Sequence, residues 1–366
     1  LAISLSVAMC AQSIPIYAAE EIGTSAAADF FAEDSIENQS LNEGDEDGFW
    51  SGESETVESS ANGSDGWESA EMDGAEAGDE AVKRDAAAFV SGDVEENVEE
   101  TGETNELEDL IQKSFEEERT CYERMDQVIS LSNYMQELLY HDYGVDINRI
   151  IIIPNGMSDK IKEEVDQKRL RKKWHLYPEE QMIIFVGRLE EIKGTHFLIR
   201  AFQLILQESP NCRLWIVGDG DYQNSFSEAN PIFSKITFTG FVDQTSLFEL
   251  YRLADVGVVP SLFEPFGYVP VEMMMHELPI VATATSGLNE VVDESCGLKV
   301  PLIVSPDSVE IDTSLLAQKI VYLLQNPKEA KRLGKNGRKR YLEKYSSEVF
   351  GKNMIAFYKS LFQECK

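Results

Sequence analysis

Hydrophobic positions from residue 181 onward form short runs that alternate with stretches of helical spacing. The runs are almost continuously apolar, which is typical of buried strands, and they cover residues 182–186, 213–217, 236–238, 256–260 and 279–282. Helices are predicted at about residues 196–207, 244–253, 270–276, 315–324 and 330–345. This alternation predicts an α/β fold, in which a doubly wound, Rossmann-like parallel sheet is covered by helices on both faces.

A shorter pattern of the same kind precedes this region. Residues 126–132 are expected to form a strand and residues 136–143 a helix. A second, fully apolar strand is expected at 150–153, and it ends in the Pro-Asn-Gly turn at 154–156. A last helix is predicted at about 349–362.

The first 19 residues carry no charge and end in Tyr-Ala-Ala before Glu20, like the apolar core and cleavage region of a secretory leader. The basic start of a leader is missing, and the chain begins with Leu, which suggests an incomplete record. A short membrane anchor and an apolar start without function are the alternatives. Residues 20–106 are dominated by Gly, Ser, Ala, Asp and Glu without a periodic apolar face, so we predict a long disordered acidic segment.

The charge of the chain is concentrated in this part. From Glu20 to Glu118 there are 33 acids and three bases, which account for −30 of the total −34, whereas the remainder has 33 acids and 29 bases. The excess of acid excludes nucleic acid as an expected partner. The five cysteines and four histidines are dispersed without ligand spacing, so we expect no metal site and no cofactor.

In a parallel α/β sheet ligands bind at the carboxyl ends of the strands, so the loops after the apolar runs are the candidates for chemistry. The first loop holds Gly187 and Arg188, then Lys193 and Gly194 before a helix. Two cations and a backbone that allows close approach suit a diphosphate. A solvated turn is the alternative.

The next two loops carry weaker signals. Gly218 and Asp219 begin a glycine turn whose Asp219 and Asp221 have the spacing of a metal pair, but a turn near a nucleotide is the preferred interpretation. The glycines do not complete a dinucleotide-binding fingerprint. Phe241, in the following loop, would offer an apolar surface to a base, and core packing explains it equally well.

The fourth loop, residues 261–269, leads into the helix predicted from Pro270 and is the most informative. It brings Glu264 and Glu272 to one crevice, and carboxylates can accept hydrogen bonds from vicinal hydroxyls and stabilise a developing positive charge on a sugar. Glu272 could instead be an acid that favours the helix dipole. The fifth loop, residues 286–290, adds Gly287 and Glu290, or is a simple turn.

In this order and spacing, the motifs resemble the family 4 glycosyltransferases (glycosyl transferases group 1) of the two-domain GT-B type, over about residues 126–362. The matching segments are 154–156, 186–189 with 193–194, 217–220, 238–241, 264–272 and 287–290. The resemblance implies that Arg188, Lys193 and Glu264 are catalytic: the two cations hold the donor diphosphate, and Glu264 contacts the donor sugar. It assigns the remaining donor contacts to Gly187, Gly218, Asp219, Phe241, the backbone of Phe266, Gly267, Tyr268 and Val269, and to Glu272, Gly287 and Glu290.

The resemblance further implies transfer of a hexosyl group from a nucleotide-diphosphate sugar, with retention and without a metal. It places the donor domain at residues 158–345 and a terminal crossing helix at 346–366. The acceptor-binding domain is reduced to a remnant at 107–157, so the acceptor, a glycan, lipid or peptide, has no named residues. The alternatives are a nucleotide-sugar-binding module without catalysis and a half-enzyme completed by a partner chain. The family's location is cytoplasmic or membrane-associated, whereas the apolar start suggests export.

Overall fold

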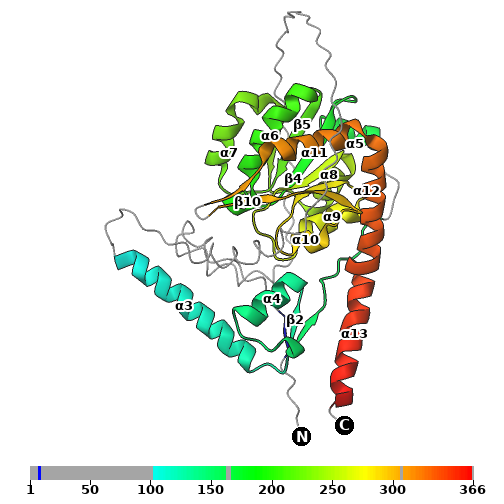
Figure 1. Ribbon diagram of the computed structural model, residues 1–366. Helices are drawn as coiled ribbons and strands as arrows, with labels where there is room; N and C mark the ends of the chain where they lie inside the picture. Colours follow the sequence, from blue (N-terminus) through cyan, green and yellow to red (C-terminus); the bar gives the residue numbers. More distant parts are fainter. Residues whose placement is uncertain (1–6, 10–101, 162–165, 306–307, 365–366) are drawn as a thin grey trace, which may run out of the picture. The chain divides into compact units, whose positions relative to one another are not determined.

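The computed structural model describes residues 7–9, 102–161, 166–305 and 308–364 (Figure 1). They belong to one compact unit, formed by Leu1–Gln12 and Val82–Lys366. The predicted leader or anchor and the predicted acidic disordered segment otherwise lie outside the described residues. Among the helices that are described, none is long and apolar enough to span a membrane.

A six-stranded parallel sheet forms the centre of the larger domain. Its strands are β4 (Gln181–Val186), β5 (Cys212–Val217), β6 (Ile236–Gly240), β7 (Val256–Val259), β8 (Ile280–Thr283) and β9 (Gly297–Val300). Their order is β6-β5-β4-β7-β8-β9, and every neighbouring pair is parallel. The order reverses between β4 and β7, and such a switch point opens a crevice at the carboxyl ends of the strands.

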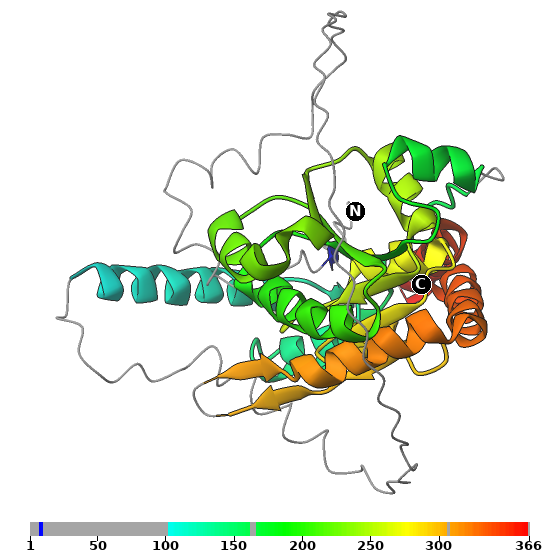
Figure 2. The ribbon, with the colours of Figure 1, turned by 90° about the horizontal axis from the view of Figure 1, so that it is seen from above.

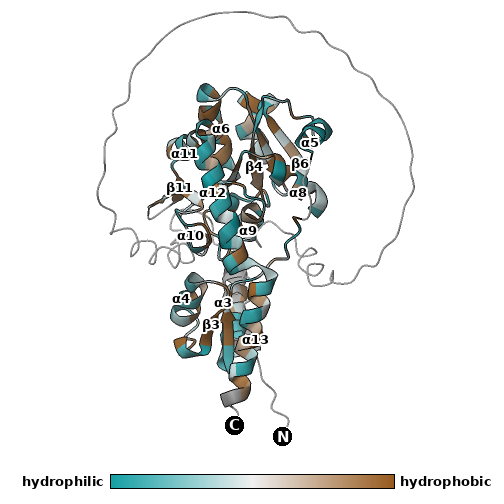
Figure 3. Ribbon diagram, turned by 90° about the vertical axis from the view of Figure 1, so that its right-hand side faces the viewer, coloured by the Kyte–Doolittle hydropathy of each residue, from teal (hydrophilic) through white to brown (hydrophobic). Residues whose placement is uncertain are grey.

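Helices cover both faces of this sheet. They are α5 (Gln167–Lys173), α6 (Thr195–Glu208), α7 (Tyr222–Ala229), α8 (Gln244–Leu253), α9 (Tyr268–Met275), α10 (Leu288–Val291), α11 (Thr313–Gln325) and α12 (Pro327–Arg340). Helices α6 and α11 lie side by side over one face (Figure 2). Along β4 the buried side chains alternate: Met182 and Ile184 belong to one core cluster, Ile183 and Phe185 to the other. The two cores confirm the predicted doubly wound sheet, whose strands are strongly apolar (Figure 3).

A three-stranded parallel sheet contains the preceding elements. Strand β2 (Gln127–Ser130) lies between β1 (Val7–Met9) and β3 (Ile150–Ile152). Helix α4 (Asn133–His141) and a 3-10 turn, η2 (Ile147–Arg149), connect β2 to β3. Residues 7–9, expected within a leader or anchor, thus form a strand of this sheet, which the sequence analysis did not predict.

Helix α3 (Gly102–Glu123), which was not predicted, overlaps the end of the segment expected to be disordered, residues 20–106. Its apolar residues recur at helical spacing (Leu107, Leu110, Ile111, Phe115 and Tyr122), and the rings of Phe115 and Tyr122 lie 4.6 and 5.3 Å from that of Tyr143. Opposite charges also lie one turn apart, with Lys113 4.0 Å from Glu117 and Arg119 3.7 Å from Glu123. Such i,i+4 pairs, together with the many Glu residues, add to the stability of the helix.

The C-terminal part of the chain ends the larger domain and returns to the three-stranded sheet. A small antiparallel pair, β10 (Leu302–Val304) and β11 (Val309–Ile311), precedes α11. The helix predicted at 330–345 is α12 followed by a π-helical turn, η5 (Tyr341–Tyr345). The predicted last helix is α13 (Ser347–Glu364), whose Phe357 and Leu361 pack on Ile129 and Ile153 of the smaller sheet region.

Candidate functional site

Main-chain hydrogen bonds join the loops at the carboxyl ends of the central strands. The loop after β4 bonds to the end of β5 and to the loop that follows it: the amide of Gly187 donates to Val217 (3.0 Å), and that of Leu189 to Asp219 (2.9 Å). The loop after β5 bonds in the same way to the end of β6, because the amide of Gly218 donates to Gly240 (3.0 Å). A Cβ at position 218 would lie 1.9 Å from the carbonyl oxygen of Gly187, and its φ of 137° also favours glycine. The glycine motif therefore allows these loops to pack backbone against backbone.

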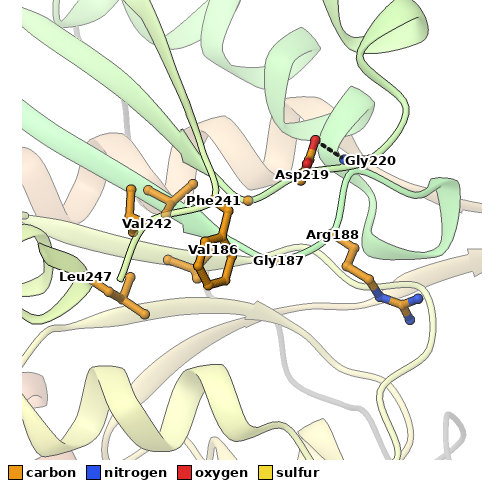
Figure 4. A pocket seen from close by; sticks show the side chains of 10 residues that line it. Val186, Gly187, Arg188, Asp219, Gly220, Phe241, Val242 and Leu247 are labelled. Atoms are coloured by element: carbon orange, nitrogen blue, oxygen red, sulfur yellow. Dashed lines mark hydrogen bonds between the residues drawn. The ribbon is translucent and has the colours of Figure 1, made fainter. Parts of the chain in front are cut away.

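A cavity of about 610 Å³ opens beside these glycines (Figure 4). One part of its wall is apolar, and the other is formed by the glycine turns with Arg188 and Asp219; the residues are Val186, Gly187, Arg188, Val217, Gly218, Asp219, Gly220, Phe241, Val242 and Leu247. Phe241 is 84% exposed, so it is not part of the core, and that alternative from the sequence is wrong. An apolar wall with a cation beyond it fits a ligand that has a flat ring and an anionic group.

Lys193 and Glu264 form an ion pair in the crevice, with 2.8 Å between Nζ and Oε2. Lys193 ends the 3-10 turn η3 (Glu191–Lys193), and Gly194 follows in the left-handed conformation (φ 66°). The side chains of the pair are 22% and 14% exposed, so both are largely shielded yet reachable. The structure thus brings together two predicted catalytic residues from loops after non-consecutive strands.

Arg188 lies nearer the solvent. Its Nη1 is 2.6 Å from Oε1 of Glu190, and its side chain is 52% exposed. The guanidinium points away from the glycine turns in Figure 4. Because an exposed pair of this kind contributes little to stability, Arg188 can exchange Glu190 for an anionic ligand at small cost.

The loop that follows β7 turns sharply into α9. Gly267, at φ 97°, is the residue before the helix, which begins at Tyr268. The side chain of Phe266 is buried, so this residue can offer only its backbone to a ligand. The first amides of a helix have no partner within the helix and are suited to anions or hydroxyls. Tyr268 and Val269 occupy this first turn, whereas the sequence placed them in the loop before a helix starting at Pro270. The Tyr268 hydroxyl accepts a hydrogen bond from Asn155.

Glu272 lies one turn further into α9, not in its first turn as predicted from a helix start at Pro270. This position weakens the alternative that it acts only on the helix dipole. The hydroxyl of Tyr251 donates to Oε2 of Glu272 at 2.9 Å. Burial raises the pKa of the Glu272 carboxyl above its usual value, while this hydrogen bond and the charge of Lys160 act in the opposite direction. Tyr251 was not recognised from the sequence, because a Tyr at helical spacing is typical of core packing.

Asp219 caps its own glycine turn, since its Oδ1 accepts the amide of Gly220 at 2.9 Å. This contact favours the turn interpretation over a metal pair with Asp221. Within the described ranges, no group of three or more His, Cys, Asp or Glu residues could hold a metal ion.

Gly287 and Glu290 lie around the start of α10. A Cβ at Gly287 would be 1.7 Å from the carbonyl oxygen of Pro265, so glycine permits the close approach of this turn to the loop of Glu264. Glu290 does not line the cavity: its carboxylate accepts the amides of Asn133 (2.9 Å) and Tyr134 (2.6 Å) at the start of α4. Ser286, the residue before Gly287, bonds to the backbone of Glu264, with its Oγ 2.9 Å from both the nitrogen and the carbonyl oxygen of that residue.

Comparison with known proteins agrees with this geometry. Residues 166–340 match the family model described as Glycosyl transferases group 1. An uncharacterized glycosyltransferase of Methanocaldococcus jannaschii is 31% identical over 240 residues, which cover 64% of this chain and 60% of that protein. The capsular polysaccharide biosynthesis glycosyltransferase CapM of Staphylococcus aureus is 26% identical over 65% of this chain and 62% of its own length. The chain therefore spans less than two thirds of these curated relatives.

Solved structures show the same fold. Sucrose-phosphate synthase from Thermosynechococcus elongatus superposes with a TM-score of 0.59 at 30% identity, over 69% of this chain and 62% of that one. Anabaena HepE, solved in complex with UDP-glucose, gives 0.58 at 20% identity over 68% of each chain. Residues 166–340 are thus similar in sequence to the Glycosyl transferases group 1 family, and their fold is similar to that of these solved structures.

Proposed function

We propose that the crevice binds a nucleotide-diphosphate sugar and that the chain acts in glycosyl transfer as a family 4 hexosyltransferase. Two observations carry this proposal: the Lys193–Glu264 ion pair between the loops that follow β4 and β7, and the cavity lined by Arg188 and the exposed ring of Phe241. Along its length, a nucleotide-diphosphate sugar requires first an apolar surface for the base, then cations for the diphosphate, and then a carboxylate for the sugar. The UDP-glucose in the Anabaena structure supports the ligand class, because that protein shares the fold.

In this assignment the base lies against Phe241 and the apolar side chains next to it. Glu272 accepts the ribose hydroxyls through the carboxylate oxygen that Tyr251 leaves free. Arg188 and Lys193 hold the diphosphate, and the amides at the start of α9 complete the phosphate contacts. Glu264 then faces the donor sugar.

The proposed reaction retains the configuration of the sugar. The bond between the anomeric carbon and the diphosphate oxygen breaks, and the acceptor oxygen forms its bond on the same face. The acceptor proton passes to the leaving phosphate oxygen, so the protein need not supply a base. Lys193 and Arg188 stabilise the charge that develops on the diphosphate, a role that preorganised cations perform well in a shielded site.

The acceptor half is the less defined part of the proposal. The acceptor is a glycan, a lipid or a peptide, and it would bind on the side of the three-stranded sheet. If the donor site works only with a second chain, the protein is a half-enzyme; if it never transfers sugar, it is a nucleotide-sugar-binding module. We place the activity in the cytoplasm or at a membrane surface, where nucleotide sugars are available.

A test of donor hydrolysis distinguishes an enzyme from a nucleotide-sugar-binding module. The purified chain is incubated with UDP-, GDP- and ADP-sugars, and release of the nucleoside diphosphate is followed with and without simple glycan acceptors. We expect slow release from one donor, which Glu264→Gln abolishes and Glu294→Gln leaves unchanged, since the Glu294 side chain is 84% exposed. Tight binding without any release would favour the binding module, and neither binding nor release would overturn the proposal.

A further inference from the structure

The start of α4 contacts the loop that carries Glu264, although the two are far apart in the sequence. Ser132 is the N-cap of α4, where its Oγ accepts the amide of Met135 (3.1 Å). The same hydroxyl donates to the carbonyl oxygen of Pro265 at 2.9 Å. On the other side of Glu264, the ring of Phe263 lies edge-on to that of Tyr134, with 5.9 Å between centroids. Both neighbours of Glu264 are therefore in contact with the first turn of α4 or its cap.

Glu290, a residue of α10, binds the N-terminal end of α4. Its two carboxylate oxygens accept separate amides, those of Asn133 and Tyr134, and one of them also accepts the side-chain amide of Asn133 at 2.5 Å. A carboxylate at a helix N-terminus satisfies amides that have no partner within the helix and is favoured by the dipole. Leu131, just before the cap, is buried in the same core cluster as Phe266.

Helix α10 in turn fixes the backbone of Glu264. The carbonyl oxygen of Glu264 accepts the amide of Leu288, the first residue of α10, at 3.1 Å. It also accepts the hydroxyl of Ser286, which receives the Glu264 amide in return. Glu264 is thus held from α10 on one side, while its neighbours are held from α4 on the other, and Glu290 connects the two helices.

We propose that Ser132 and Glu290 are positioning residues that set the loop of Glu264 for the donor sugar, and that neither touches the ligand. This inference rests on the proposed function and changes the assignment of Glu290, which the family resemblance placed among the donor contacts. It predicts a selective defect. Loosening the loop should impair recognition of the sugar by Glu264 more than binding of the diphosphate, because Arg188 and Lys193 lie outside this loop.

The test compares Glu290→Gln and Ser132→Ala with the wild-type chain, with Glu294→Gln as the control four positions from Glu290. Amide hydrogen exchange of residues 261–270 is measured without ligand. We expect exchange to be about tenfold faster in both variants, as loss of one or two hydrogen bonds would allow, and unchanged in the control. Calorimetry then compares a nucleoside diphosphate with its sugar conjugate: the conjugate should bind about tenfold more weakly to the variants and the diphosphate within about twofold of wild type.

Wild-type exchange rates in both variants would overturn the positioning role. So would an equal loss of affinity for the diphosphate and its conjugate in Glu290→Gln, since that is the result expected of a direct donor contact. If no nucleotide binds the wild-type chain, the proposed function fails, and the exchange experiment still decides whether Ser132 and Glu290 hold the loop. Should Ser132→Ala fail to fold, as judged by circular dichroism, Glu290→Gln carries the same test.

Discussion

The Nζ of Lys193 lies 2.8 Å from Oε2 of Glu264, which joins two loops whose residues are 71 positions apart. Both side chains are mostly shielded from solvent, so loss of either partner would leave the other charge unpaired and poorly solvated. The cation is therefore held in the crevice before a ligand arrives. A donor diphosphate would replace part of this ion pair. It would bind to a lysine that is already held in position, not to a flexible, solvated one.

Removal of the lysine tests this role. Lys193→Ala should weaken the binding of a nucleoside diphosphate by ~1.5–3 kcal/mol, the range for a charge-assisted contact. Calorimetry measures the change, and Lys339→Ala is the control because Lys339 is an exposed lysine in a loose pair with Glu343 (3.8 Å). The same affinity in Lys193→Ala and Lys339→Ala would exclude a phosphate contact at position 193.

The glycine turn should be intolerant of a side chain. Gly218→Ala would place a Cβ 1.9 Å from the oxygen of Gly187 at a φ of 137°, and we expect a loss of roughly 2–4 kcal/mol in the free energy of unfolding, from backbone strain and overpacking together. Gly144→Ala is a matched control, because Gly144 also has a positive φ (68°) but no atom within 4 Å of the added Cβ. Urea unfolding measures the free energy of unfolding of both variants. An equal loss of this free energy in the two would contradict the packing argument.

Nucleotide affinity should depend on pH through Glu272. Burial raises the pKa of its carboxyl, and only the ionised form can accept two ribose hydroxyls, so affinity should fall as the pH drops through this raised value. Tyr251→Phe removes the hydrogen bond that lowers this pKa, and the loss of affinity should therefore begin at a higher pH than in the wild type.

The measurement is a calorimetric titration at a series of pH values for both proteins. Tyr341→Phe is the control, since this buried Tyr donates to Met157 and not to Glu272. Identical pH profiles for Tyr251→Phe and the wild type would show that Glu272 does not titrate in the binding step.

Much of the larger domain followed from local patterns. The helix at Gln244–Leu253 was predicted with the same bounds, because its apolar spacing is regular and Asp243 caps it through the amide of Ser246 (2.9 Å). Strand β9 was missed, since Gly297 and Lys299 interrupt the apolar run of a strand at the edge of the sheet. Helix α3 was missed, although Leu107, Leu110 and Phe115 recur at helical spacing, because the acids between them continue the composition of the preceding segment.

The site was predictable where it depends on the order of loops along a parallel sheet. The loops that follow parallel strands lie at one edge of the sheet, and this made Lys193 and Glu264 candidates for the same site. Their direct ion pair depends on the adjacency of β4 and β7, which was not predicted. The contact of Glu290 with Asn133 and Tyr134 follows no such rule. It spans more than 150 positions and depends on how α4 packs, which no local pattern encodes.

The central claim, that this crevice is built for a nucleotide linked to a diphosphate, is tested most directly by one comparison. The wild-type chain is titrated calorimetrically with uridine, guanosine and adenosine and with the corresponding diphosphates. We predict that one diphosphate binds at least about tenfold more tightly than its nucleoside, because Arg188 and Lys193 together should contribute more than ~1.4 kcal/mol. Equal affinity for nucleoside and diphosphate, or no binding by a folded chain, would contradict the account.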